Sequence, residues 1–165
     1  DLLNRRMEEE TERFLLEHYE EFYRLAYGYV KTEQDALDVV QESAYKAIRD
    51  CGKIQNPEYL KTWICRIVIN TSVDLLRKKK KEFPHALDQE PELADERDEF
   101  SSCEQIDVKE LLDRLEEKEK AVIMLRYFHD MKLEEIAQVL GENVNTVKAR
   151  LYRTLRKLRV VLEEE

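Results

Sequence analysis

The residues best suited to recognition chemistry lie near the end of the chain, where basic and aromatic side chains recur at helical spacing. Residues 142–159 hold six basic side chains and one acidic one, although the whole chain of 165 residues carries a formal net charge of −9. One face of this segment collects Lys148, Ala149, Tyr152, Arg153 and Arg156. Arg and Lys bind phosphates and base edges, and the major groove of DNA admits one helix. The face therefore indicates DNA as its partner, with an ordinary solvated helix surface as the alternative.

The residues just before this face predict how its helix is positioned. Apolar side chains recur every three or four residues within 133–140, which predicts a short helix. Gly141 follows, where a helix commonly ends in a left-handed conformation, and Asn143 or Asn145 can cap the next helix. The second helix has a buried stripe of its own, made of Val147, Leu151, Leu155 and Leu158. Two short helices joined by a tight turn with a glycine predict a helix-turn-helix.

A second candidate site lies in the middle of the chain. The segment 58–81 is periodic enough for a helix and ends in the basic run 77–81. The candidate residues on it are Trp63, Arg66, Asn70, Arg77, Lys78 and Lys79. One aromatic beside basic residues is a modest signal for single-stranded DNA, and the basic run could grip phosphates. It could equally be a helix end whose cations suit the helix dipole.

A third candidate site lies on the segment 33–49. Its apolar residues Ala36, Val39, Val40, Ala44 and Ala47 predict one buried helix face. The opposite face presents Asp38, Gln41, Glu42, Tyr45 and Arg49 in steps of three and four. Tyrosine and arginine often anchor protein interfaces, so this face is a candidate partner surface, although most such faces are only solvated.

These segments predict an all-α fold made of two small helical domains. Helical periodicity over 8–30, 33–49 and 58–80 predicts an N-terminal helical bundle in residues 8–82, and the helix-turn-helix belongs to a C-terminal domain, residues 105–163. Between them, 83–104 loses the apolar periodicity and is rich in acids, which predicts a flexible acidic linker. We therefore expect variable spacing between the domains.

Other site chemistries find little support. The cysteines Cys51, Cys65 and Cys103 lack the pair spacing of a zinc site, and their odd number fits no closed disulfide set, so we expect reduced thiols with Cys65 partly buried. No nucleophile motif, phosphate loop or metal spacing appears, so we expect no catalysis, no metal and no cofactor. No apolar stretch approaches the roughly twenty residues of a membrane span, and no signal peptide is recognisable.

Three segments together resemble the extracytoplasmic-function (ECF) sigma factors, group 4 of the sigma-70 family. DALDVVQESAYKAI (35–48) resembles the family's polymerase-clamp-binding segment, and YLKTWICRIVINTSVDLLRKKKK (59–81) its −10 recognition and melting segment. LEEIAQVLGENVNTVKARLYRTLRKL (133–158) resembles its −35-binding helix-turn-helix. The resemblance covers nearly the whole chain in the family's order and is closest to the σV type of Firmicutes.

The resemblance implies a role for each site. The β′ clamp of core RNA polymerase would be contacted by Asp38, Gln41, Glu42 and Tyr45. The loop 50–57, with Lys53 and Asn56, would hold a flipped base of the −10 element, and Arg66, Asn70 and the basic run 77–81 would lie near that DNA. The face on 148–156 would read the −35 element. This chain departs from the family at four positions of the segment 133–158. Where it has Asn145, Ala149 and Thr154-Leu155, the family often has Gly, Ser and Ala-Arg. The resemblance therefore does not define which −35 sequence the chain would read.

The resemblance also implies the partners and the setting. One implied partner is core RNA polymerase, contacted through its β′ clamp and its β flap. The others are promoter DNA, in double- and single-stranded form, and a membrane-anchored anti-sigma factor. No small-molecule substrate is implied. The chain would direct promoter-specific transcription initiation in response to envelope stress. It would act in the cytoplasm, or be held at the inner face of the membrane by the anti-sigma factor. The alternative function is a helix-turn-helix regulator that binds DNA without polymerase, which leaves the segments 33–49 and 58–81 unexplained.

Overall fold

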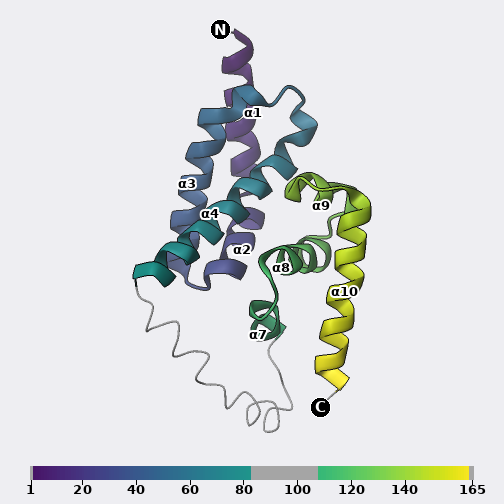
Figure 1. Ribbon diagram of the computed structural model, residues 1–165. Helices are drawn as coiled ribbons and strands as arrows, with labels where there is room; N and C mark the ends of the chain where they lie inside the picture. Colours follow the sequence, from purple (N-terminus) through teal and green to yellow (C-terminus); the bar gives the residue numbers. More distant parts are fainter. Residues whose placement is uncertain (1, 83–107, 164–165) are drawn as a thin grey trace.

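The computed structural model describes residues 2–82 and 108–163, and within these ranges it contains helices and no strand, which confirms the all-α prediction (Figure 1). The N-terminal unit, residues 2–82, contains α1 (Leu2–Glu17), α2 (Tyr19–Val30), α3 (Glu33–Asp50), the 3-10 turns η1 (Cys51–Lys53) and η2 (Pro57–Tyr59), and α4 (Leu60–Glu82). The C-terminal unit, residues 108–163, contains α7 (Val108–Asp113), α8 (Glu117–Ile123), the π-helical turn η3 (Met124–Phe128), α9 (Leu133–Leu140) and α10 (Val144–Glu163). The proposed linker 83–104 and Cys103 lie outside the described residues.

The first helical segment is divided, whereas the sequence predicts one helix over 8–30. His18 leaves helical geometry, with φ −112° and ψ 19°, and separates α1 from α2. Its backbone N–H still donates to the carbonyl of Phe14 at 3.0 Å, and its ring lies 4.2 Å from the Phe14 ring. Because no glycine or proline marks this position, the apolar periodicity alone did not reveal the break.

The helices α3 and α4 form as the sequence predicts, and identifiable residues define their starts. Thr32 caps α3, because its side chain accepts a hydrogen bond from the backbone N–H of Asp35 at 3.2 Å. The segment 50–57 is more ordered than the predicted loop, since η1 and η2 occupy much of it. Asn56 caps η2 in the same way, accepting from the N–H of Glu58 at 3.0 Å.

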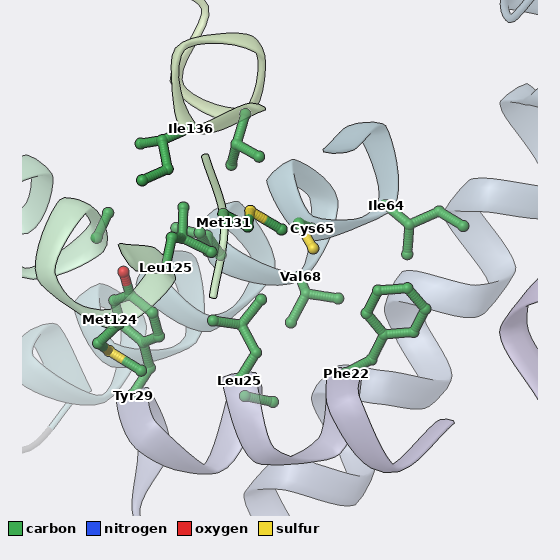
Figure 2. Packing of buried hydrophobic residues seen from close by; sticks show 14 of the residues in the cluster. Phe22, Leu25, Tyr29, Ile64, Cys65, Val68, Met124, Leu125, Met131 and Ile136 are labelled. Carbon is green, nitrogen blue, oxygen red and sulfur yellow. The ribbon is translucent and has the colours of Figure 1, made fainter. Parts of the chain in front are cut away.

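The two units share one apolar core, which corrects the expectation of variable spacing. Figure 2 shows Leu125 and Ile136 of the C-terminal unit facing Leu25 of α2 and Val68 of α4. The buried residues of α4 span an unusually wide band, namely Leu60, Thr62, Ile64, Cys65, Val68, Ile69, Thr71, Ser72 and Val73. This band is wide enough for α4 to pack against α2 and α3 and also against α9 (Figure 1). An apolar surface shared in this way holds the units together because separating them would expose it to water.

Of the helices described in 2–82 and 108–163, none is both long enough and apolar enough to cross a membrane.

Candidate nucleic-acid and partner interfaces

The polar face predicted on α3 is exposed. Ala36, Val39, Val40 and Ala47 are buried in the core, and Ala44 is half-buried. The opposite side leaves Asp38, Gln41, Glu42 and Tyr45 exposed; we call these four residues the α3 face. The structure therefore brings the four predicted residues together on one solvent-facing surface.

Contacts along the helix order the α3 face. The amide of Gln34 donates to Asp38 at 3.2 Å, and Lys46 lies 3.5 Å from Glu42. The guanidinium of Arg49 lies over the Tyr45 ring, 5.6 Å from its centroid. A hydrogen bond from Arg49 also holds the pKa of Asp50 below its ordinary value. An exposed tyrosine held by an arginine, at one end of a face that carries two carboxylates, presents both apolar area and negative charge to a partner.

A cavity of about 470 Å³ lies at the start of α4 and contains several of the predicted DNA residues. The volume is within the range of small-ligand sites. Its lining is Lys53, Ile54, Gln55, Asn56, Tyr59, Thr62, Trp63, Arg66 and Gln138, and we call it the base pocket. Trp63 is half-buried and Tyr59 is 49% exposed, so two aromatic rings, one turn apart, border the same space. Aromatic rings beside cationic side chains suit an unpaired base and its phosphate.

The base pocket also shows what sequence reasoning missed. Tyr59 was not among the predicted residues, although its spacing of four from Trp63 could have indicated it. Gln138 was missed because it comes from α9, far along the chain. Asn56 has a structural role as well, because its side-chain oxygen caps η2, and the same residue lines the pocket.

The basic residues of α4 divide between two sides of the helix. Arg66, Asn70 and Arg77 lie on one side, where they line a second cavity of about 390 Å³ with Asp74 on α4 and Glu117 and Lys118 on α8. We call Arg66, Asn70 and Arg77 the α4 track. Helical rotation explains why the remaining basic residues do not join it. Lys79 forms an ion pair with Asp35 of α3, and Lys78 is exposed without lining either cavity.

The helix-turn-helix is present with the predicted turn. Gly141 ends α9 with φ 66°, a left-handed conformation that suits glycine, and Asn143 accepts a hydrogen bond from the N–H of Asn145 at 2.7 Å. Val147, Leu151 and Thr154 of α10 are buried. Burial of these side chains sets the orientation of α10 about its own axis, and therefore determines which of its other side chains are exposed to solvent.

The predicted DNA-reading residues of α10 are all exposed. They are Lys148, Ala149, Tyr152, Arg153 and Arg156, and we call them the α10 face. Arg159 lines the same shallow hollow as Tyr152 and Arg156, and it extends the α10 face toward the C-terminus. Its helical spacing from these two residues could have indicated it in the sequence. Arg150 is different, because it is half-buried and lies 2.8 Å from Glu142, so its role is structural.

Neither of the two cysteines in the described ranges, Cys51 and Cys65, lines the base pocket or the α4 cavity. Cys51 and Cys65 are free thiols in the core, and each is 1% exposed, so Cys65 is more deeply buried than expected. Burial raises the pKa of the Cys65 thiol to about 12, which keeps it protonated and unreactive near neutral pH. In the ranges 2–82 and 108–163, no group of three His, Cys, Asp or Glu side chains could hold a metal ion.

Comparison with known proteins identifies the family. The family described as Sigma-70 region 2 matches residues 14–82, and the family described as Sigma-70, region 4 matches residues 105–158. RNA polymerase sigma factor SigV of Bacillus subtilis is 44% identical over 151 residues, which cover 92% of this chain and 90% of that protein. ECF RNA polymerase sigma factor SigW of the same organism is 27% identical over an alignment that covers 88% of this chain and 84% of SigW.

A solved structure confirms the fold. The sigma factor RpoE of Bartonella quintana, determined in complex with the anti-sigma factor NepR, superposes with a TM-score of 0.67 at 21% identity. The match covers 92% of this chain and 96% of that one. Together with the two matched regions and the relative at 44% identity, it confirms the resemblance found in the sequence: the chain belongs to the sigma-70 family of RNA polymerase sigma factors, in its ECF group.

Proposed function

We propose that this chain binds core RNA polymerase and directs it to a defined set of promoters. The observation that carries the proposal is that one chain combines the α10 face, which suits duplex DNA, with a base pocket that suits an unpaired base. A protein that only binds duplex DNA needs the first surface alone. Promoter opening needs both. Sigma factors are not enzymes, which agrees with the expectation of a non-catalytic chain.

Polymerase docking is assigned to the α3 face. Its two carboxylates suit a basic partner surface, and the exposed Tyr45 supplies apolar area at its edge. The matching partner surface is the clamp of the β′ subunit. A second contact is assigned to the C-terminal unit, where an apolar groove formed by Leu111, Leu115, Leu158 and Val160 is edged by arginines and Lys157. This groove suits the β flap.

Promoter recognition is divided between the units. The base pocket and the α4 track bind the −10 element as a separated strand, with Tyr59 and Trp63 available for stacking. The α10 face enters the major groove at the −35 element, as the second helix of a helix-turn-helix does. On this assignment residues 8–82 form the polymerase-binding and −10 domain, 83–104 the linker, and 105–163 the −35 domain.

Control by an anti-sigma factor is proposed from family membership. Envelope stress would release the chain from an inhibitor that covers its polymerase-binding or DNA-binding surfaces. We place the chain in the cytoplasm, where RNA polymerase acts, and at the inner face of the membrane when a membrane-anchored inhibitor holds it. A pull-down from unstressed and stressed cells tests this, because the inhibitor should be recovered mainly before stress.

Co-elution with core polymerase tests the main proposal. Purified chain and purified core polymerase are mixed and separated by size-exclusion chromatography. We expect the chain to move to the polymerase fraction in a one-to-one ratio. A chain that binds DNA but stays apart from core polymerase would instead be a stand-alone DNA-binding regulator.

A further inference from the structure

The helix α1 buries a polar side chain and leaves apolar ones in solvent. Thr11 is 0% exposed and is the one buried residue of Leu2–Glu17, whereas Leu2, Leu3 and Leu16 are 83%, 76% and 79% exposed. In Figure 1, α1 lies beside the end of α3 from which the loop to α4 begins, and it contacts both α3 and η1. A threonine in the most buried position of a helix requires a specific neighbour, because apolar residues usually occupy such positions.

The neighbour of Thr11 is Cys51, the first residue of η1. The hydroxyl of Thr11 donates a hydrogen bond to the backbone carbonyl of Met7 at 2.7 Å, and a side-chain hydrogen bond joins Thr11 to Cys51. Cys51 is 1% exposed. Burial raises the pKa of its thiol, and the charge of Glu8 raises it further. Thr11 is thus small enough for η1 to approach closely, and its hydroxyl is satisfied within its own helix.

Asn4 makes a second contact with η1. The Oδ1 atom of Asn4 lies so close to Gly52 that a Cβ atom at Gly52 would be 3.2 Å from it. Asn4, Glu8 and Thr11 are spaced by four and then three residues, so they share one face of α1. Successive turns of α1 therefore support Cys51 and Gly52.

The segment that these contacts hold is the loop that lines the base pocket. Between the buried residues Cys51 and Leu60, every residue except Ile54 is exposed. The N–H of Ile54 donates to the carbonyl of Cys51 at 3.0 Å, so the position of Cys51 affects the residues that follow. A loop with few buried side chains of its own depends on its two ends for its shape. Four of its residues line the pocket, namely Lys53, Ile54, Gln55 and Asn56.

The helix α1 is fixed firmly enough to act as this support. Backbone hydrogen bonds continue across the break at His18, from its N–H to the carbonyl of Phe14 at 3.0 Å and from the N–H of Phe22 to its carbonyl at 3.1 Å. Phe22 is buried in the core, so α1 continues from an anchored helix. The match to Sigma-70 region 2 begins at residue 14, and it therefore assigns no role to Thr11.

We propose that α1 positions the base-pocket loop, and that Thr11 holds Cys51 so that the loop is shaped for an unpaired base before DNA binds. Thr11 is a positioning residue, since it does not line the pocket itself. The inference rests on the assignment of the base pocket to −10 DNA. A site that is shaped in advance binds more tightly, because less conformational freedom is lost when the ligand binds.

Three substitutions in α1 separate support of the loop from general stability. Thr11→Ala removes the buried side chain beside Cys51 and should loosen the loop. Thr11→Ser keeps the hydroxyl and its hydrogen bonds, so it should behave like the parent. Leu15→Ala is the matched control, because it also removes a partly buried side chain from α1, but one that packs against the apolar core.

The thiol of Cys51 reports the state of the loop without DNA. The full chain is treated with iodoacetamide under native conditions, and alkylation of each cysteine is followed by mass spectrometry. Thr11→Ala should speed alkylation of Cys51 about tenfold by populating an open loop, whereas Thr11→Ser and Leu15→Ala should not. Cys65, which is equally buried, is the internal control and should react slowly in every variant. A parent-like rate at Cys51 in Thr11→Ala would overturn the proposal.

The DNA measurement compares strands with and without a base. Labelled −10 single strands, taken from a promoter that the parent transcribes, carry one abasic position each and are titrated with holoenzyme. The position at which base removal weakens parental binding most is the one that the pocket holds. At that position Thr11→Ala should reduce the preference for the intact strand about fivefold, with unchanged affinity for duplex −35 DNA. A parental preference in a variant whose Cys51 has become reactive would also overturn the positioning role.

A double-mutant cycle tests whether Thr11 acts through the loop. Lys53→Ala removes a side chain of the loop from the pocket lining. Thr11→Ala should then cost less affinity for the intact strand in the Lys53→Ala chain than in the parent, because both changes affect the same contacts. Fully additive losses would overturn this route. Failure of the proposed function gives a different result, since the parent holoenzyme would then bind intact and abasic strands equally well at every position.

Discussion

The Nζ atom of Lys157 on α10 lies 2.8 Å from the Oε2 atom of Glu119 on α8, and this ion pair holds the DNA-reading helix against its supporting helix. The side chain of Glu119 is 8% exposed and also meets the hydroxyl of Thr154 at 3.3 Å and the backbone N–H of Glu116 at 3.2 Å. Burial raises the pKa of Glu119, but the bonds from Lys157, Glu116 and Thr154 outweigh it, so the pKa lies below its ordinary value.

Glu119→Ala should destabilise the C-terminal unit. The substitution leaves the N–H of Glu116 without its side-chain acceptor and Lys157 without its carboxylate partner, at a cost of about 1–3 kcal/mol in the free energy of unfolding. Because the folded pKa is lowered, the contribution of Glu119 is present above its ordinary pKa and is lost as pH falls through the folded value. Urea unfolding followed by circular dichroism, at pH 7 and at pH 3, measures both effects.

Glu134→Ala is the control for that experiment, since Glu134 is an exposed acid in the same unit. Its effect should be small at either pH. Equal stability of Glu119→Ala and the parent at pH 7 would show that the buried carboxylate does not hold α10 in place.

The base pocket predicts that Tyr59 and Trp63 act by stacking. Tyr59→Ala and Trp63→Ala should each weaken binding of an unpaired −10 strand to the holoenzyme by about 1–3 kcal/mol, whereas Tyr59→Phe keeps the ring and should bind as the parent does. Fluorescence anisotropy with single-stranded and duplex probes measures this. If the two alanine variants lost as much affinity for fully duplex −35 DNA as for the unpaired −10 strand, the assignment of these rings to stacking on an unpaired base would be wrong.

The α10 face predicts different roles for two arginines. Arg153→Ala should cost about 1–3 kcal/mol on a specific −35 site if Arg153 makes a bidentate contact to a base, and should relax specificity at that position. Arg156→Ala should weaken binding to all DNA sequences by a similar factor and should lower the salt dependence of binding, as the loss of a phosphate contact does. Titrations of specific and unrelated duplexes at two salt concentrations separate the two effects. If both variants lost the same affinity for specific and unrelated duplexes, the assignment of Arg153 to base recognition would be wrong.

The α3 face predicts the polymerase contact. Asp38→Arg combined with Glu42→Arg reverses two exposed charges and leaves the buried stripe of α3 unchanged, so helix content should stay normal. If the pair is central to the interface, binding to core polymerase should weaken by about 2–5 kcal/mol. The control reverses two exposed acids of α1, with Glu9→Arg and Glu12→Arg. Parent-like affinity of the α3 double variant at physiological salt would show that the docking face is wrong.

Much of the architecture follows from local patterns. Periodicity predicted α3, α4 and α10 closely, because each buries apolar side chains at helical spacing. Gly141 marked the turn because a left-handed conformation there suits glycine. The break at His18 has no such marker. It depends on local ring packing and not on a residue that breaks helices.

The parts that could not be predicted depend on contacts between distant segments. The packing of α9 on α4 places Gln138 in the base pocket and Glu117 against Arg77, and no local pattern encodes either contact. Lys79 looked equivalent to Arg77 in the sequence, but rotation about α4 turns it toward Asp35.

Reconstituted transcription tests whether this chain directs core polymerase to promoters. Core polymerase is incubated with a pool of promoter fragments from the source genome, with and without the chain, and the transcripts are sequenced. We expect discrete start sites that require the chain and that disappear with the Asp38→Arg and Glu42→Arg double variant. Transcripts that do not depend on the chain, although the chain still binds duplex DNA, would contradict it and identify a DNA-binding regulator instead.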